Sequence, residues 1–185
     1  MNPVTAVNSF RTRVFRSALT RPANTDAYAA GDVISAVTTN AHFTFGTALS
    51  GAMVGDQKKL GRPGFLSGAI NALRLHSSAN QATKLDAQLF LFHTDITAVA
   101  DNAAFAPTDA EMLTLVGVID IPSYSWSVGA AAAGADGNAV AEIKNIDLPY
   151  ITGVTGQLFG QLVARNAYVP VSGEMLTIDL VVTPD

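Results

Sequence analysis

The chain has 185 residues, of which 49% are hydrophobic and only 14% are charged, and it contains no cysteine. Its length suits a single domain with a sizeable core, and the lack of cysteine excludes disulfides and thiolate chemistry. The net charge of −4 argues against general nucleic-acid binding, and no apolar run predicts a signal peptide or a membrane span. A surface so poor in charge suggests that other subunits cover much of it.

The N-terminal part of the chain is basic, whereas the rest is acidic. Residues 1–62 hold seven of the eleven Lys and Arg but three of the fifteen Asp and Glu. Residues 1–21 are interpreted as a basic arm or an edge strand, with a strand over Phe10–Leu19 that ends before Pro22. We expect the arginines of this segment to bind a neighbouring acidic surface: Arg11, Arg13, Arg16 and Arg21.

Residues 22–185 are expected to form one β-sandwich domain. Short strands are predicted over Val33–Val37 and His42–Phe45, and they precede an irregular, glycine-rich stretch over residues 46–64. A loop of this length in a compact domain is often an interaction segment. Its basic residues are therefore further candidates for partner binding: Lys58, Lys59 and Arg62.

The clearest strand is Leu85–His93, in which apolar and polar residues alternate with a period of two. Phe90 and Phe92 make its second face apolar too, so we expect this strand to lie centrally in a sheet. Ala69–Ser77 alternates in the same way. The polar turn over residues 78–83 predicts that the two strands form a hairpin.

The remaining segments predict further strands and one helical turn. Thr108 or Asp109 is expected to cap that turn, and a loop is expected over Gly129–Asn138. Strands are predicted over Met112–Ile121, Val140–Leu148 (ending at Pro149), Gln157–Val169 and Leu176–Val182. About eight or nine strands without a long amphipathic helix predict an all-β fold. We expect an antiparallel, jelly-roll-like β-sandwich with an N-terminal arm.

No pattern of residues predicts catalysis, a metal or another cofactor. The histidines lack the spacing of a metal site and are interpreted as polar strand edges: His42, His76 and His93. The acidic residues after the central strand lack the calcium-loop pattern and are assigned to caps and turns: Asp95, Asp101, Asp109 and Glu111. A glycosidase pair among Glu111, Glu142 and Glu174 would require the fold to bring two of them together. We therefore expect a protein that is not an enzyme.

Two aromatic residues, Tyr124 and Trp126, stand close together in an otherwise polar turn. Such rings could stack on a sugar or anchor a protein interface, and the second role is favoured. They complete the set of residues that we expect to bind a partner.

Four segments together resemble a group of small virion proteins of tailed bacteriophages: Ala27–Ile34, Ala87–Phe92, Asp101–Pro107 and Val116–Ile119. The order and spacing of these segments match from about Tyr28 to the C-terminus. The resemblance implies a β-sandwich structural protein without catalytic residues, of the head-decoration or cement type. It also implies synthesis in the host cytoplasm, a place on the particle surface, and contact with the major capsid protein or another virion protein.

The sparse charge further predicts a homo-oligomer, with a trimer favoured. The alternative function is a carbohydrate-binding or receptor-binding module of a tail or head fibre. A shallow groove lined by Trp126 and Tyr124 would favour that alternative, and a flat, self-complementary face would favour a cement protein. The sequence does not distinguish a position on the head from one on the tail.

Overall fold

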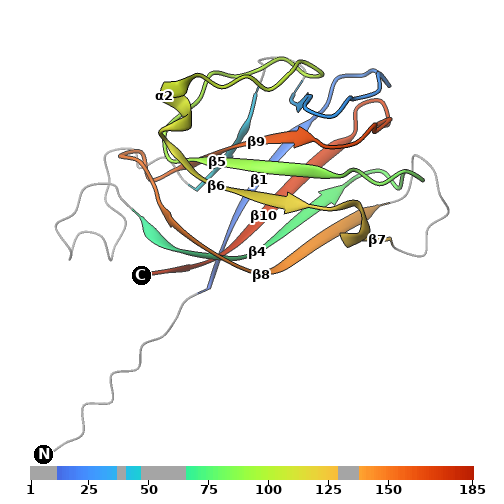
Figure 1. The fold of residues 1–185 in the computed structure, drawn as a ribbon. Coiled ribbons are helices and arrows are strands. Elements are labelled where there is room, and N and C mark those ends of the chain that lie inside the picture. Colours follow the sequence, from blue (N-terminus) through green and yellow to red (C-terminus); the bar gives the residue numbers. More distant parts are fainter. Residues whose placement is uncertain (1–11, 37–40, 47–65, 129–137) are drawn as a thin grey trace, which may run out of the picture.

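The computed structural model describes residues 12–36, 41–46, 66–128 and 138–185, which form two antiparallel β-sheets packed face to face (Figure 1). The strands are β1 (Arg13–Thr20), β2 (Val33–Ile34), β3 (Phe43–Phe45), β4 (Ser67–Ser77), β5 (Ala87–Phe92), β6 (Leu115–Ile121), β7 (Trp126–Val128), β8 (Ala139–Ile151), β9 (Leu158–Ala164) and β10 (Met175–Pro184). The described residues also include the short helices α2 (Asp109–Met112) and η1 (Ser123–Ser125). None of the described helices has the length and apolar character needed to cross a membrane.

The strand order identifies a jelly roll. The first sheet has the order β1-β10-β4-β8-β7, and the second has the order β2-β9-β5-β6, with β3 also paired to β9. The antiparallel pairs are nested, because β1 pairs with β10, β2 and β3 with β9, β4 with β8, and β5 with β6. In a jelly roll, a long antiparallel hairpin is rolled up so that its successive pairs of strands belong alternately to the two sheets. The predicted jelly-roll-like β-sandwich is confirmed.

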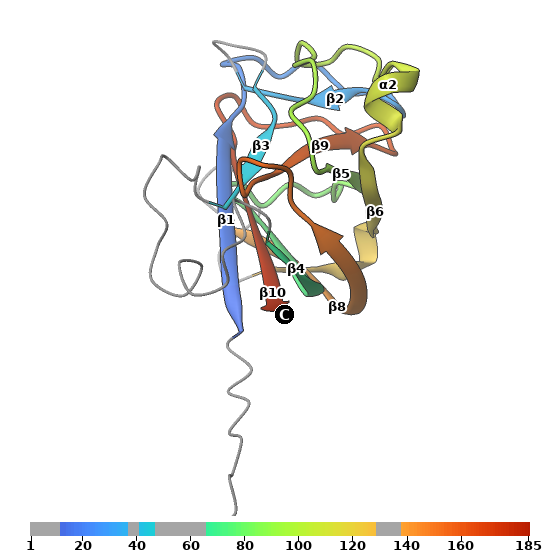
Figure 2. The ribbon, with the colours of Figure 1, turned by 90° about the vertical axis from the view of Figure 1, so that its left-hand side faces the viewer.

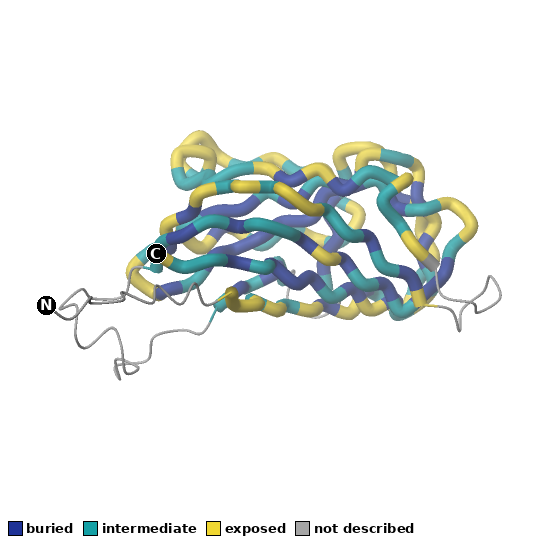
Figure 3. The backbone as a smooth tube through the Cα atoms, turned by 90° about the horizontal axis from the view of Figure 1, so that it is seen from below, coloured by how far each residue is buried: buried dark blue, intermediate teal, exposed yellow. Residues whose placement is uncertain are grey.

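The main core lies between the sheets and follows from the period-two pattern of the strands. Along β10, Leu176, Ile178 and Leu180 are fully buried, whereas the intervening Thr177 is partly exposed. Figure 3 shows buried residues alternating with less buried ones along the strands. The alternating residues of the sequence therefore correspond to the inner and outer faces of the sheets.

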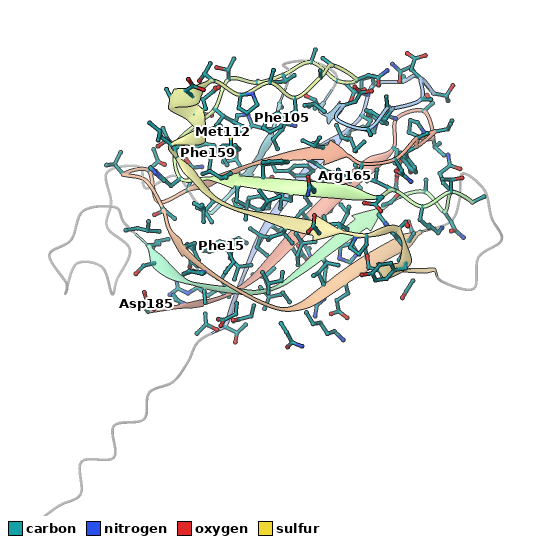
Figure 4. The ribbon with its side chains drawn as sticks, viewed as in Figure 1. Phe15, Phe105, Met112, Phe159, Arg165 and Asp185 are labelled. Carbon is teal, nitrogen blue, oxygen red and sulfur yellow. The ribbon has the colours of Figure 1, made fainter. Side chains whose placement is uncertain are left out.

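A second, smaller core covers the outer face of the β5 sheet. It consists of Phe92, Ile96 and Phe159, with Phe90 and Phe105 packed against it. Figure 4 labels Phe105 and Phe159 in this region of the molecule. The predicted central position of the β5 strand, with cover on both faces, is confirmed, because β5 lies between β9 and β6.

The predicted hairpin between Ala69–Ser77 and Leu85–His93 is wrong. β4 pairs with β10 and β8, whereas β5 pairs with β9 and β6, so residues 78–86 cross from one sheet to the other. The strand predicted to end at Leu148 also continues through Pro149 to the end of β8. Proline is tolerated there because, among the described strands, β7 pairs only with residues 139–141 and no strand pairs with β8 on that side beside Pro149.

The N-terminal segment that was interpreted as an arm or an edge strand has β1 at its described end. β1 forms the edge of the first sheet and is paired with β10 along its whole length. Residues 1–11 lie outside the described part of the chain, as do 47–64 of the predicted long loop together with Phe65, and 129–137 of the alanine-rich loop.

Candidate functional site

Arg21 is buried within the protein rather than exposed on an arm. It is 1% exposed, its Nε donates to the Tyr28 hydroxyl, and its Nη2 donates to the Asp101 carboxylate at 3.2 Å. Its guanidinium carbon also lies 4.7 Å from the centre of the Tyr28 ring. The Tyr28 hydroxyl and the Ser35 N–H donate to the same Asp101 oxygen, at 2.6 and 2.9 Å. The assignment of Arg21 to partner binding is therefore corrected, because its side chain is buried and forms an ion pair with Asp101 inside the protein.

A second buried polar group adjoins this network. The rings of Tyr28 and Tyr168 stack with their centres 6.5 Å apart, and the Tyr168 hydroxyl lies within 2.8 and 2.9 Å of the two Glu174 carboxylate oxygens. Ser77 also donates to Glu174, which is 1% exposed. Burial is the main cause that raises the pKa of both tyrosines far above its usual value, and the neighbouring carboxylates raise it further. Both hydroxyls thus remain donors, and the network joins distant segments of the chain.

The three glutamates do not form a catalytic pair. Glu174 is bound by Ser77 and Tyr168, whereas Glu142 is bound by Arg74 and Lys144 on the outer face of β8. Glu111 lies in α2, where it accepts backbone N–H groups. Each carboxylate therefore has its own separate set of partners.

The outer face of the first sheet carries a row of alternating charges, which we call the charge row: Arg16, Asp179, Arg74 and Glu142. The strand registers place each of these residues directly opposite the next. Arg16 donates to Asp179 at 2.6 and 2.7 Å, and Arg74 donates to Glu142 at 3.0 Å. The hydrogen bonds from Arg16 hold the pKa of Asp179 below its usual value. The charge row therefore holds two ion pairs, and Glu142 also binds Lys144 at 2.9 Å.

The histidines lie in three separate places. His42 is paired with Asp95 at 3.0 Å, and burial lowers its pKa. The Nε2 atom of His76 lies 3.8 Å from Asp179, and Nδ1 of His93 lies 3.0 Å from the Thr94 hydroxyl. Within the described residues, no three histidine or acidic side chains come together in a way that could hold a metal ion.

Tyr124 and Trp126 do not share one environment. Tyr124, in η1, is 88% exposed. Trp126 packs against the main core, and its indole N–H donates to the Leu85 carbonyl at 2.7 Å. Trp126 also lines a small recess together with Lys84 and Tyr168, and Tyr124 is not among the residues that line it. Within the described residues, the recess beside Trp126 is therefore not a groove lined by both rings.

One end of the sandwich carries exposed apolar side chains that the sequence reasoning did not single out. We call this group the apolar end: Met112, Leu113, Ile151 and Val154. Leu113 is 86% and Val154 is 74% exposed. Figure 2 views the molecule from this end, where α2 and the β8–β9 connection both lie, and Figure 4 labels Met112 on it. The sequence did indicate that Leu113 would be exposed, because this apolar residue directly follows a capped polar turn.

Backbone contacts join the two halves of the apolar end through His93. The His93 N–H donates to the Thr114 carbonyl at 3.0 Å, next to Leu113. On the other side, a Cβ atom added to Gly153 would lie 2.4 Å from the His93 carbonyl oxygen, so the β8–β9 connection packs tightly there. The contacts of His93 therefore hold in place the backbone that carries the exposed apolar residues.

The helix turn that positions Met112 is capped as predicted. The Thr108 side chain accepts the Glu111 N–H, and the Glu111 carboxylate accepts the Thr108 N–H at 2.7 Å, which is a capping box. The same carboxylate accepts the Thr97 N–H at 2.7 Å. These backbone hydrogen bonds, those of Thr108 first, lower the pKa of Glu111 to about 2. Glu111 thus joins α2 to the preceding loop.

The other basic residues expected to bind a partner are distributed as follows. Arg13 is exposed at the start of β1, and Arg16 is paired with Asp179. Arg11, Lys58, Lys59 and Arg62 lie outside the described residues.

Comparison of the chain with models of known protein families gave no match, and no curated protein matches it in sequence.

Proposed function

We propose that this protein is a non-enzymatic structural protein of a tailed-phage particle, of the head-decoration or cement type. In this role it binds the major capsid protein or another virion protein on the particle surface. The observation that carries the proposal is the apolar end of a jelly roll, where exposed apolar residues lie on well-anchored backbone. The resemblance of four sequence segments to phage virion proteins supports the same function.

The fold and the surface support a structural role. Jelly rolls are common among viral capsid and lectin domains. Within the described residues, the charged side chains that come together form internal ion pairs, such as Arg21 with Asp101 and Arg16 with Asp179. Such pairs give these four charged residues roles within the fold, which supports a structural function.

The apolar end is suited to docking because burial of apolar area drives association. Complete burial of a Leu or Val side chain contributes roughly 1.5–3 kcal/mol. Leu113 and Val154 are exposed enough for most of that gain to be available on binding. A particle presents many copies of the same site, so a modest affinity at each site is sufficient for full occupancy when contacts are repeated.

A carbohydrate- or receptor-binding module of a fibre remains the second candidate, and one observation favours it. Tyr124 exposes 88% of its surface, and an exposed aromatic ring is a suitable stacking platform for a sugar. The engagement of Trp126 with the core leaves Tyr124 to act alone, so the first candidate is the better supported of the two.

The experiment uses particles of the phage that encodes the protein, prepared without it, and measures how much added protein they bind. The variant Leu113→Asp/Val154→Asp should bind much less than the unmodified protein. Val118→Asp is the matched control, because Val118 is also exposed but lies on the outer face of β6. Equal binding by all three proteins would overturn the role of the apolar end.

The same assay distinguishes the two candidate functions. Tyr124→Ala should bind particles normally if the protein is a cement protein. No binding of the unmodified protein to particles, together with glycan binding that Tyr124→Ala abolishes, would establish the second candidate instead. Electron microscopy of the reconstituted particles would then locate the protein on the head or the tail.

A further inference from the structure

We propose that the outer face of the first sheet binds the same face of a second copy of this chain, around a two-fold axis parallel to the strands. The proposal rests on the charge row and on the residues beside it. It is independent of the apolar end, which lies on a different part of the surface.

The face has few charges outside the charge row. On one side of the row, the registers align Val14, Val181, Ala72 and Lys144 across β1, β10, β4 and β8. These positions lie on the outer face because the intervening residues, such as Leu73 and Leu180, are fully buried between the sheets. Three of the four aligned residues are small and apolar.

The row on the other side has a similar character. It aligns Ala18, Thr177, His76 and Val140 in the same strand order. Apart from Lys144 and His76, the side chains on both sides of the charge row are small, which lets a second sheet approach closely, as in the packing of two sheets in a sandwich.

The charge row can be covered without leaving a charge unpaired. Asp179 is only 3% exposed although it points outward, and Arg16 binds it through two nitrogens. Glu142 is bound by both Arg74 and Lys144, and these hydrogen bonds lower its pKa. Burying an unpaired charge is costly, whereas a paired and hydrogen-bonded charge is tolerated.

The order of the charges makes the face complementary to itself in one orientation only. A two-fold axis parallel to the strands, between β10 and β4, reverses the row. Arg16 then faces Glu142 of the second copy, and Asp179 faces Arg74 of the second copy. In the neighbouring rows, Lys144 faces Val14 and Ala18 faces Val140, so no like charges meet.

The other face-to-face orientation is unfavourable. An axis along the row would place each charged residue opposite itself, Arg16 against Arg16 and Asp179 against Asp179, and like charges repel. Charge complementarity therefore selects a second copy in the reversed arrangement. The two-fold pair differs from the trimer that the composition predicts, and sedimentation distinguishes the two.

The size of the face sets the expected affinity. Four strands about 4.8 Å apart and seven residues of about 3.4 Å each give a face of roughly 19 by 24 Å. Two copies would together bury about 900 Å², which is below the roughly 1,200–2,000 Å² of stable specific interfaces and belongs to weak, transient ones. We therefore expect a dissociation constant on the order of micromolar, and pairing that weakens as salt rises.

Cysteine cross-linking tests the arrangement directly, because the chain has no cysteine of its own. Ala18 and Val140 of one chain lie on β1 and β8, three strand spacings or about 14 Å apart. The single variants Ala18→Cys and Val140→Cys are treated with a bis-maleimide whose spacer is much shorter than that. A mixture of the two variants should give covalent dimers, and either variant alone should not.

Two outcomes of the cross-linking would overturn the proposal. One is the absence of dimers in the mixture at concentrations where sedimentation shows association. The other is cross-linking of a Val14→Cys and Ala18→Cys mixture instead, which is the pairing expected for an axis along the row.

Sedimentation over a concentration series gives an independent test. Ala18→Lys should weaken self-association roughly tenfold or more, because it places a charge against Val140 of the second copy. Val118→Lys, on the other sheet, is the control and should associate normally. A monomer at all concentrations, a trimer, or association that Ala18→Lys leaves unchanged would each refute the two-fold pair. If the unmodified protein is monomeric and Ala18→Lys lowers only particle binding, the face contacts the shell and the proposal fails.

Discussion

The guanidinium of Arg16 binds the carboxylate of Asp179 through two hydrogen bonds, of 2.6 and 2.7 Å, across the edge pair β1–β10. Two parallel hydrogen bonds between Arg and a carboxylate are among the strongest polar contacts in proteins. Although Arg16 is largely exposed, Asp179 is almost fully buried. The pair therefore helps to fix the N-terminal strand to the sandwich, and the segment interpreted as an arm contributes to the fold.

Replacing Arg16 should destabilise the protein in a pH-dependent way. Because Arg16 lowers the pKa of Asp179 in the folded state, the stabilisation is present above the unfolded pKa of Asp, about 3.9, and is lost as the pH falls through the folded pKa. At neutral pH, Arg16→Met should lower the free energy of unfolding, because the nearly buried Asp179 then loses its bidentate partner. Urea unfolding of both proteins at neutral and strongly acidic pH checks this. A difference that persists unchanged in acid would show that the effect does not come from Asp179.

Arg21→Met should be more damaging. It leaves the Asp101 carboxylate nearly buried without its cation, and losing one member of a buried ion pair costs about 3–5 kcal/mol. Arg165→Met is the matched control, because Arg165 is exposed and donates only to Gln88 within the described residues, so a change within about 0.5 kcal/mol is expected. Both values come from urea unfolding monitored by the fluorescence of Trp126. Similar stabilities for the two variants would mean that the network around Arg21 is of little energetic importance.

Large-to-small substitutions in β5 should be strongly destabilising. Leu89 and Leu91 are fully buried in the main core, so changing either to Ala should lower the free energy of unfolding by about 2–5 kcal/mol. Leu113→Ala removes the same atoms from an exposed position and should have little effect. Melting temperatures of the three variants test the expectation, which an unchanged value for both core variants would contradict.

Glu111→Gln should loosen the loop before α2 without affecting the core. The carboxylate accepts the N–H groups of Thr97 and Thr108, whereas a neutral amide has only one oxygen and must turn its NH₂ group toward one of them. We expect faster hydrogen exchange at Thr97 or Thr108, and unchanged exchange at the buried Leu89. Because the pKa of Glu111 is held at about 2, the unmodified protein should keep slow exchange at these amides well below pH 4. Identical exchange in both proteins would show that Glu111 does not hold the loop.

Local patterns were sufficient to predict the elements of the fold and much of the core. The alternation over Leu85–His93 correctly predicted a central strand, and the Thr108 cap was found from residue types alone. These features depend on neighbours in the sequence, through the two-residue period of a strand and the short reach of a capping side chain. The predicted hairpin failed because alternation looks the same whichever sheet a strand joins.

The sequence by itself determined the class of this protein: an all-β chain whose core strands alternate and whose surface is poor in charge. Only the tertiary structure decided which residues meet. It buried Arg21 against Asp101, aligned Arg16, Asp179, Arg74 and Glu142 in one row, and brought Leu113 and Val154 to the same end. These residues are far apart along the chain, and no local rule relates them. The nested pairing of the jelly roll brings them together, because each strand pairs across long stretches of sequence and its register fixes what lies opposite each side chain.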